Sequence, residues 1–173
     1  MNVLIVYSSL TGNTKLIAQS IHSELSRAEI SHSFDIFPVE TAPEPDNYDI
    51  IYAGFWADKG GADPKTKQYL SKIQNKSVVL FFTLGAYPHS EHANRIFINA
   101  KNILNPNNKA LDEHFKCMGK IDPKILEIST KAHGAMTPER AARIEEAKKH
   151  PDENDCSNAK IFAQESFRKV CQC

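Results

Sequence analysis

Cysteine is scarce in this sequence, and no two cysteines stand in the C-x-x-C spacing that is typical of zinc and redox sites. The four cysteines are Cys117, Cys156, Cys171 and Cys173. An iron–sulfur cluster or a structural zinc ion needs more ligands at regular spacing, so we expect no metal centre. We interpret Cys171 and Cys173 as part of a terminal tail, and we expect no disulfide framework in a chain of this size.

Long apolar runs and an excess of charge of one sign are also missing. No stretch is long and apolar enough to span a bilayer, and Met1 leads almost directly into an expected strand rather than into a signal-like segment. The 21 basic and 21 acidic residues cancel, which gives no support to a nucleic-acid partner. We therefore expect a cytoplasmic protein that binds neither nucleic acid nor membrane.

Strand and helix patterns alternate along the chain, which predicts an α/β fold with a parallel sheet and helices on both faces. The five expected strands are Val3–Tyr7, Ser33–Phe37, Ile50–Phe55, Val78–Phe82 and Phe115–Met118. The fourth run is apolar throughout, as expected for a strand covered on both faces, whereas the second alternates and suits a half-exposed edge strand. For 173 residues we expect one domain, 1–173.

Signals for helix starts follow several of these strands. Asp63-Pro64 fits an N-cap followed by a proline at the first helical position, and Ser90 fits a second N-cap. The last helix is expected at Cys156–Val170. Residues 119–150 read as an added helical segment before it, in which we interpret Pro138–Lys149 as a solvated surface helix.

A loop rich in hydroxyl groups lies between the first strand and the first expected helix. It reads Ser8-Ser9-Leu10-Thr11-Gly12-Asn13-Thr14, and the helix after it carries Leu16, Ile17, Ile21 and Leu25 on one face. Hydroxyl groups, free backbone N–H groups and the positive end of a helix dipole converge at such a loop, which favours a bound phosphate. Gly12 lets the backbone approach the anion closely. The alternative is a plain serine- and threonine-rich turn with an N-cap.

The pattern Ser9-x-Thr11-Gly12-x-Thr14 after Ile5-Val6-Tyr7 resembles the phosphate loop of flavodoxins. The resemblance implies a flavodoxin-like three-layer sandwich, with a five-stranded parallel sheet in the order 2-1-3-4-5. It also implies that FMN is the cofactor and that this loop holds its phosphate. The net charge of zero departs from the acidic composition of many flavodoxins.

Two further loops resemble those that clasp the flavin ring in flavodoxins. The first, from Phe55 to Asp63, contains the only tryptophan of the chain, and the second, from Thr83 to His92, contains a tyrosine beside a proline. The resemblance assigns to the ring site the residues Phe55, Trp56, Ala57, Asp58, Lys59, Gly60, Gly61, Thr83, Leu84, Gly85, Ala86, Tyr87, His89 and His92. At the two glycines a backbone carbonyl could turn toward the flavin N5.

Each of these side chains also has a structural interpretation. Trp56 could belong to the core, and Tyr87-Pro88 could be a rigid turn. His89 and His92 could be solvated rather than near the flavin edge, and we favour that interpretation for His92.

The strings at residues 54–60 and 83–88 are similar to those of short flavodoxin-like proteins of anaerobic bacteria, among them the flavodoxin-like companions of bilirubin reductases. The resemblance implies an electron-transfer protein that donates low-potential electrons from FMN to a partner reductase, without a catalytic residue of its own. Two alternatives stay open. One is an FMN-dependent NAD(P)H or quinone reductase, and the other is a flavin-free adaptor on the same scaffold.

Overall fold

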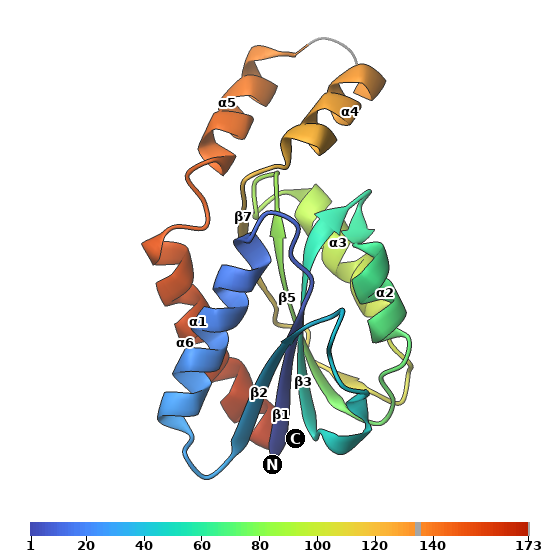
Figure 1. Ribbon diagram of the computed structural model, residues 1–173, viewed down its shortest axis with the longest axis vertical. Helices are drawn as coiled ribbons and strands as arrows, with labels where there is room; N and C mark the ends of the chain where they lie inside the picture. Colours follow the sequence, from blue (N-terminus) through green and yellow to red (C-terminus); the bar gives the residue numbers. More distant parts are fainter. Residues whose placement is uncertain (134–135, 173) are drawn as a thin grey trace.

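The computed structural model describes residues 1–133 and 136–172, which form a sheet between two helical layers (Figure 1). The strands are β1 (Asn2–Tyr7), β2 (Ser33–Pro38), β3 (Ile50–Asp58), β4 (Gly61–Ala62), β5 (Ser77–Leu84), β6 (Lys109–Ala110) and β7 (Phe115–Met118). The helices are α1 (Asn13–Ala28), the 3-10 turn η1 (Pro45–Asn47), α2 (Pro64–Leu70), α3 (Glu91–Lys101), α4 (Pro123–His133), α5 (Pro138–Ala147) and α6 (Glu153–Gln172). Cys173 and residues 134–135 of the added segment lie outside the described residues.

The strand order is β2-β1-β3-β5, with β6 and β7 both paired to the outer side of β5. All these pairings are parallel, so the predicted order 2-1-3-4-5 is confirmed. The fifth predicted strand, Phe115–Met118, coincides with β7, which pairs with the end of β5 from Phe81 onward. The two-residue strand β6, which pairs with the start of β5 at Ser77, was not predicted. The short antiparallel pairing of β4 with the end of β3 is absent from the sequence prediction.

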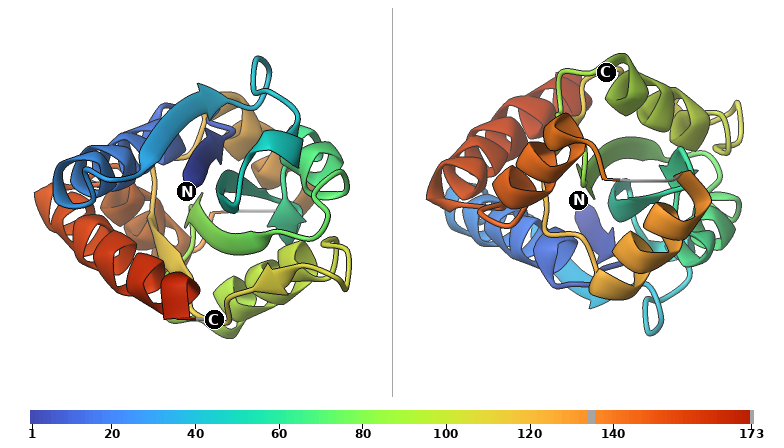
Figure 2. Two further views of the ribbon diagram at one scale, coloured as in Figure 1. Left: turned by 90° about the horizontal axis from the view of Figure 1, so that it is seen from below. Right: turned by 90° about the horizontal axis from the view of Figure 1, so that it is seen from above.

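Alternate side chains of the central strands enter two separate apolar clusters. Leu4 and Val6 of β1 belong to the cluster that also contains side chains of α2 and α3. Val3 and Ile5 belong to the cluster that is shared with α1 and α6. Figure 2 shows these two pairs of helices on opposite sides of the sheet, as the predicted three-layer α/β fold requires. Within the described residues, no helix is both long and apolar enough to cross a membrane.

Both predicted N-caps of the central helices are confirmed. The Asp63 carboxylate accepts hydrogen bonds from the N–H groups of Lys65 and Thr66 at 3.1 and 3.3 Å. The Ser90 hydroxyl oxygen accepts one from the N–H group of Ala93 at 3.2 Å. These caps fix where α2 and α3 begin, at the carboxyl ends of β3 and β5.

One residue of the predicted helix stripe lies elsewhere. Leu16 is 41% exposed, whereas Ile17, Ile21 and Leu25 are fully buried. The buried residues follow one another at intervals of four, so Leu16 lies one residue, or about 100°, to the side of that stripe. The prediction that all four share the core face was therefore wrong for Leu16.

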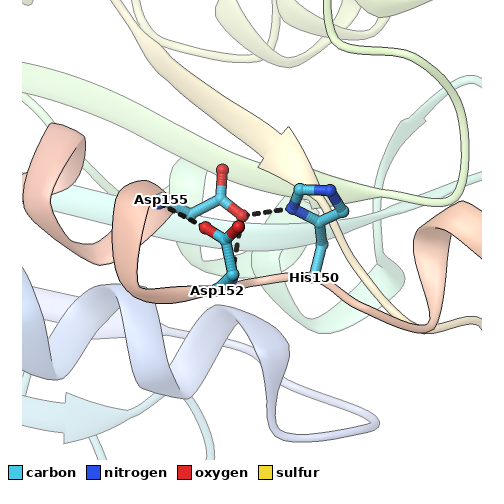
Figure 3. Close-up of side chains that lie close together, drawn as sticks. All are labelled: His150, Asp152 and Asp155. Atoms are coloured by element: carbon cyan, nitrogen blue, oxygen red, sulfur yellow. Dashed lines mark hydrogen bonds and ion pairs between the residues drawn. The ribbon is translucent and has the colours of Figure 1, made fainter.

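The last helix begins at Glu153 rather than at the predicted Cys156, because a reciprocal cap extends it (Figure 3). The N–H group of Asp155 donates to the Asp152 carboxylate at 2.8 Å, and the N–H group of Asp152 donates to the Asp155 carboxylate at 3.0 Å. The imidazole of His150 adds a contact of 2.5 Å between Nδ1 and the same Asp155 carboxylate. Together these groups hold the chain where it returns from the added segment.

The described residues of the added segment form a helical arm, which we define as residues 121–133 and 136–149 with α4 and α5. Figure 1 shows α4 and α5 beyond the carboxyl end of the sheet. Arg140 of α5 joins the two helices by donating to the hydroxyls of Ser129 and Thr130 of α4 at 3.1 and 3.2 Å. At the root of the arm, the N–H group of Lys120 donates to the carbonyl of His150 at 3.2 Å, which ties the departing chain to the returning one.

We predict that His150 makes stability depend on pH. The hydrogen bond with Asp155 is the main cause that raises the pKa of His150, and Glu146 and Asp152 act in the same direction. Because the folded pKa lies above the unfolded value of about 6.5, the stabilisation is complete below about pH 6.5 and disappears as the pH rises through the folded pKa. His150→Gln removes this contribution.

Urea unfolding at pH 5.5 and pH 8.5 measures the effect. The parent protein should lose more stability between these two pH values than His150→Gln does. The matched control His92→Gln changes an exposed histidine and should keep the parent's pH dependence. An identical loss in parent and His150→Gln would contradict the assignment.

Candidate functional site

The first turn of α1 presents backbone donors without a partner. The N-cap is Gly12, which has a φ of 89° and no side chain to satisfy the turn. Lys15 donates its N–H group to the Ser9 hydroxyl oxygen at 3.2 Å. Within the described residues, no acceptor lies in hydrogen-bond range of the N–H groups of Thr11, Gly12 and Asn13. A Cβ at Gly12 would meet no atom within 4 Å, so an anion has open space to approach.

Two buried hydroxyls fix this loop to the sheet and to α2. The Ser8 hydroxyl donates to the Asp63 carboxylate at 3.0 Å, and this carboxylate is also the N-cap of α2. The hydroxyls of Thr14 and Thr83 lie 2.9 Å apart, and Thr14 is fully buried. These two side chains therefore position the loop, whereas Ser9, Thr11 and Asn13 lie on its more accessible side.

The loop is also joined to the root of the helical arm. The Thr11 hydroxyl and the Asn13 side-chain amide both donate to the carbonyl of Lys120, at 3.2 and 2.9 Å. Gly119 lies directly against Asn13, because a Cβ at residue 119 would come within 2.5 Å of the Asn13 amide nitrogen. The chain between β7 and α4 therefore lies against the loop Ser8–Thr14.

The first predicted ring loop is a tight hairpin rather than an open loop. Lys59 and Gly60 form its turn with φ values of 47° and 81°, and Asp58 pairs with Gly61. Asn99 of α3 donates to the Gly60 carbonyl at 2.8 Å. The hairpin therefore holds the half-buried Trp56 on a rigid pair of strands at the carboxyl edge of the sheet.

Phe55 lies in the core, and the aromatic side chain of the second predicted loop, Tyr87, is exposed to solvent. Phe55 is fully buried and stacks on Phe82 with the ring centroids 5.0 Å apart, so its contacts are those of the core. Tyr87 is 51% exposed, and its carbonyl accepts hydrogen bonds from the N–H group and the hydroxyl of Ser90. His89 and His92 are exposed.

A small cavity brings the three predicted loops together. The predicted residues that line it are Leu10, Thr11, Asn13, Trp56, Ala57, Thr83, Leu84 and Gly85. The predicted residues outside its lining are Ser8, Ser9, Gly12, Thr14, Phe55, Asp58, Lys59, Gly60, Gly61, Ala86, Tyr87, His89 and His92. Their role in binding stays a prediction.

Five lining residues were missed by sequence reasoning. They are Gly119, Lys120, Ile121, Asp122 and Ile125, all from the root of the arm. The one local signal was Gly119, which needs to lack a side chain because it packs on Asn13. Nothing else in the sequence ties this stretch to a loop more than a hundred residues away.

The donor set fits a phosphate-bearing flavin. Free N–H groups at a helix N-terminus suit the phosphate, and the apolar lining by Trp56, Leu84 and Ile125 suits a flat aromatic ring. The cavity has a volume of about 60 Å³, which is small beside the roughly 300–1,000 Å³ of most small-molecule sites. The lining therefore suits part of a flat apolar ring rather than the whole of it.

The lining offers little for acid–base or nucleophilic chemistry. Among the described residues that line the cavity, the only ionisable side chains are those of Lys120 and Asp122. The Asp122 carboxylate accepts from the N–H group of Lys124 at 2.8 Å in the first turn of α4. Redox chemistry at this site would therefore have to come from a bound cofactor.

Comparisons with known proteins identify relatives of the chain. A flavodoxin domain family model matches residues 4–164. The flavodoxin-like domain-containing protein BilS of Clostridioides difficile strain CD3 is 34% identical over 176 residues, which cover 98% of this chain and 98% of that protein. Oxidised Flavodoxin 2 from Bacillus cereus superposes with a TM-score of 0.63 at 20% identity, over 98% of this chain and 99% of that one. A Fusobacterium nucleatum flavodoxin bound to flavin mononucleotide superposes with a TM-score of 0.62 at 14% identity, over 98% of each chain.

We predict that Gly12→Ala destabilises the protein by about 1–2 kcal/mol, because an L side chain is strained at positive φ. The space around residue 12 is open, so the loss should arise from the backbone and not from a clash. Gly12→Asn is the matched control, since asparagine tolerates this conformation, and it should recover part of the loss. Urea unfolding compares the two variants, and equal losses would contradict the backbone explanation.

Proposed function

The chain belongs to the flavodoxin domain family, and from this premise we propose that it binds FMN and transfers electrons to a partner reductase. The observation that carries the proposal is the row of unpaired N–H groups at Thr11, Gly12 and Asn13 beside a cavity lined by Trp56. This pairing of an anion site with an apolar site matches the two ends of FMN. FMN, when bound, supplies the redox chemistry that the side chains lack.

The residues of the chain would divide the work of holding the cofactor. The N–H groups of the loop bind the phosphate, and the buried pairs Ser8–Asp63 and Thr14–Thr83 keep those groups in place. Trp56 and Leu84 exclude water from the ring edge within the cavity. A dry, apolar surrounding near a phosphate disfavours negative charge on a reduced ring, so we propose a low reduction potential.

The carrier role has two supports. The lining residues offer no histidine, cysteine or glutamate within the described part of the chain, so the site has few groups for proton chemistry on a substrate. The resemblance to flavodoxin-like companions of bilirubin reductases suggests that the electron acceptor is a reductase of that kind. We place this exchange in the cytoplasm, with protein donors and acceptors as partners.

We predict that the apo-protein binds FMN and acquires the yellow colour and visible absorption of a flavoprotein. Riboflavin should bind at least about 100-fold more weakly, because it lacks the phosphate that several charge-assisted hydrogen bonds hold. Fluorescence titration measures both affinities, since Trp56 is the only tryptophan and lines the cavity.

Equal affinity for FMN and riboflavin would remove the loop from the phosphate site. A protein that stays colourless and binds neither flavin would instead favour the flavin-free adaptor. The control Ile161→Ala changes an apolar side chain of α6 that is 55% exposed, and it should bind FMN like the parent.

Anaerobic mixing with NADPH separates the carrier from a reductase. We predict that the absorption of the FMN-loaded protein stays unchanged for minutes after NADPH is added, because an electron carrier needs a separate donor. Dithionite in the same cuvette should bleach it, which controls for reducibility. Rapid bleaching by NADPH or NADH would favour the NAD(P)H or quinone reductase.

A further inference from the structure

Three hydrogen bonds join the root of the helical arm to residues that line the cavity. We call residues Gly119–Ile125 the strap. The N–H group of Gly119 donates to the carbonyl of Leu84 at 2.9 Å, which continues the pairing of β7 with β5. The carbonyl of Lys120 accepts hydrogen bonds from the side chains of Thr11 and Asn13. The N–H group of Lys120 donates to the carbonyl of His150, where the chain returns from the arm. The strap is therefore fixed both to the sheet and to the opening loop.

The strap places two isoleucines in the cavity wall. Ile121 packs on the backbone of Gly85, where an added Cβ would come within 2.5 Å of the Ile121 Cδ1 and Cγ1 atoms. Ile125 lies in the first turn of α4, and the Asp122 carboxylate caps that turn. Both side chains are half-buried and line the same cavity as Trp56.

These contacts differ from the two-loop clasp that the sequence predicts. Tyr87, the predicted second aromatic contact, is 51% exposed and lies outside the cavity lining. In the same lining as Trp56, apolar surface comes from Ile121 and Ile125 of the strap together with Leu84 of β5. Aliphatic side chains also hold an aromatic ring, because burial of apolar area favours binding whichever apolar side chain supplies it.

We propose that Ile121 and Ile125 contact the bound flavin, so that the root of the helical arm forms a fourth binding element beside the three loops. This inference rests on the proposed FMN site and adds to it the residues that hold the ring. It also gives the added segment a role, because α4 begins within the wall of the site. Flavin binding and the position of α4 are then linked.

The chain offers a matched pair of substitutions on one helix. Ile125→Ala removes a side chain that lines the cavity, whereas Ile128→Ala removes one that is 66% exposed on the same helix. Ile125→Ala should weaken FMN binding by about 10-fold, as expected for the loss of a few buried methyl and methylene groups. It should weaken riboflavin binding by the same factor, because the phosphate contacts are untouched. Ile128→Ala should stay within about 2-fold of the parent.

The outcomes separate the inference from the proposed function. A parent protein that binds no flavin overturns the proposed function itself. A parent that binds FMN and an Ile125→Ala variant that binds it equally well overturn the strap contact alone. An equal loss in both isoleucine variants also overturns it, since a general effect on α4 would then explain the data.

A second pair tests the wall from the side of β5, in case Ile125→Ala fails to fold by circular dichroism. Gly85→Ala forces its new Cβ against Ile121 and should weaken FMN binding about 5-fold or more. In the Ile121→Ala background, Gly85→Ala should leave the FMN affinity almost unchanged, because the Cδ1 and Cγ1 atoms that the new Cβ would meet are absent. If Gly85→Ala lowers the FMN affinity by the same factor in both backgrounds, the contact between the strap and the site is contradicted.

Discussion

The unpaired first turn of α1 is the constraint on which the rest of the structure depends. A helix N-terminus needs partners for its N–H groups, and the glycine at its N-cap supplies no side chain for that purpose. The fold does not hide this turn, because it follows β1 at the carboxyl edge of the sheet. Ser8 and Thr14 instead anchor it through Asp63 and Thr83, so the open donors have a fixed geometry. A rigid set of donors costs less entropy when it binds an anion than a flexible set does.

The sheet and its helices could be predicted because their signals are local. The stretch Val78–Phe82 of β5 is apolar throughout, and Asp63 and Ser90 cap the helices that their positions predict. The features that were missed depend on pairing between distant residues or on reciprocal contacts. The two residues of β6 carry too little pattern to mark a strand, and α6 begins early because Asp152 and Asp155 cap each other.

The candidate site was predictable only in part, for a related reason. The loop after β1, the end of β3 at Trp56 and the turn at Gly85 all lie at carboxyl ends of parallel strands, and these ends meet at one edge of the sheet. The strap carries no such signal. Its contact with Thr11 and Asn13 is made by the main-chain carbonyl of Lys120, and every residue type has such a carbonyl. Tyr87 stood out in the sequence because aromatic residues do, but its exposure shows that residue type alone does not place a side chain.

The residues of the loop Ser8–Thr14 therefore have three different structural roles, although they form one continuous motif in the sequence. Thr14 holds the loop to the core, and Thr11 and Asn13 hold the arm to the loop, so the anion binding that we propose would fall mainly to the backbone. The positions of backbone donors depend on the shape of the loop, and Lys120 helps to set that shape although it is 109 residues from Thr11 in the sequence. A change in the arm that moves this carbonyl acts on the side chains of Thr11 and Asn13 through two hydrogen bonds, and so on the loop that carries the unpaired N–H groups. For this reason we expect a displacement of the arm and a change in the shape of the loop to occur together.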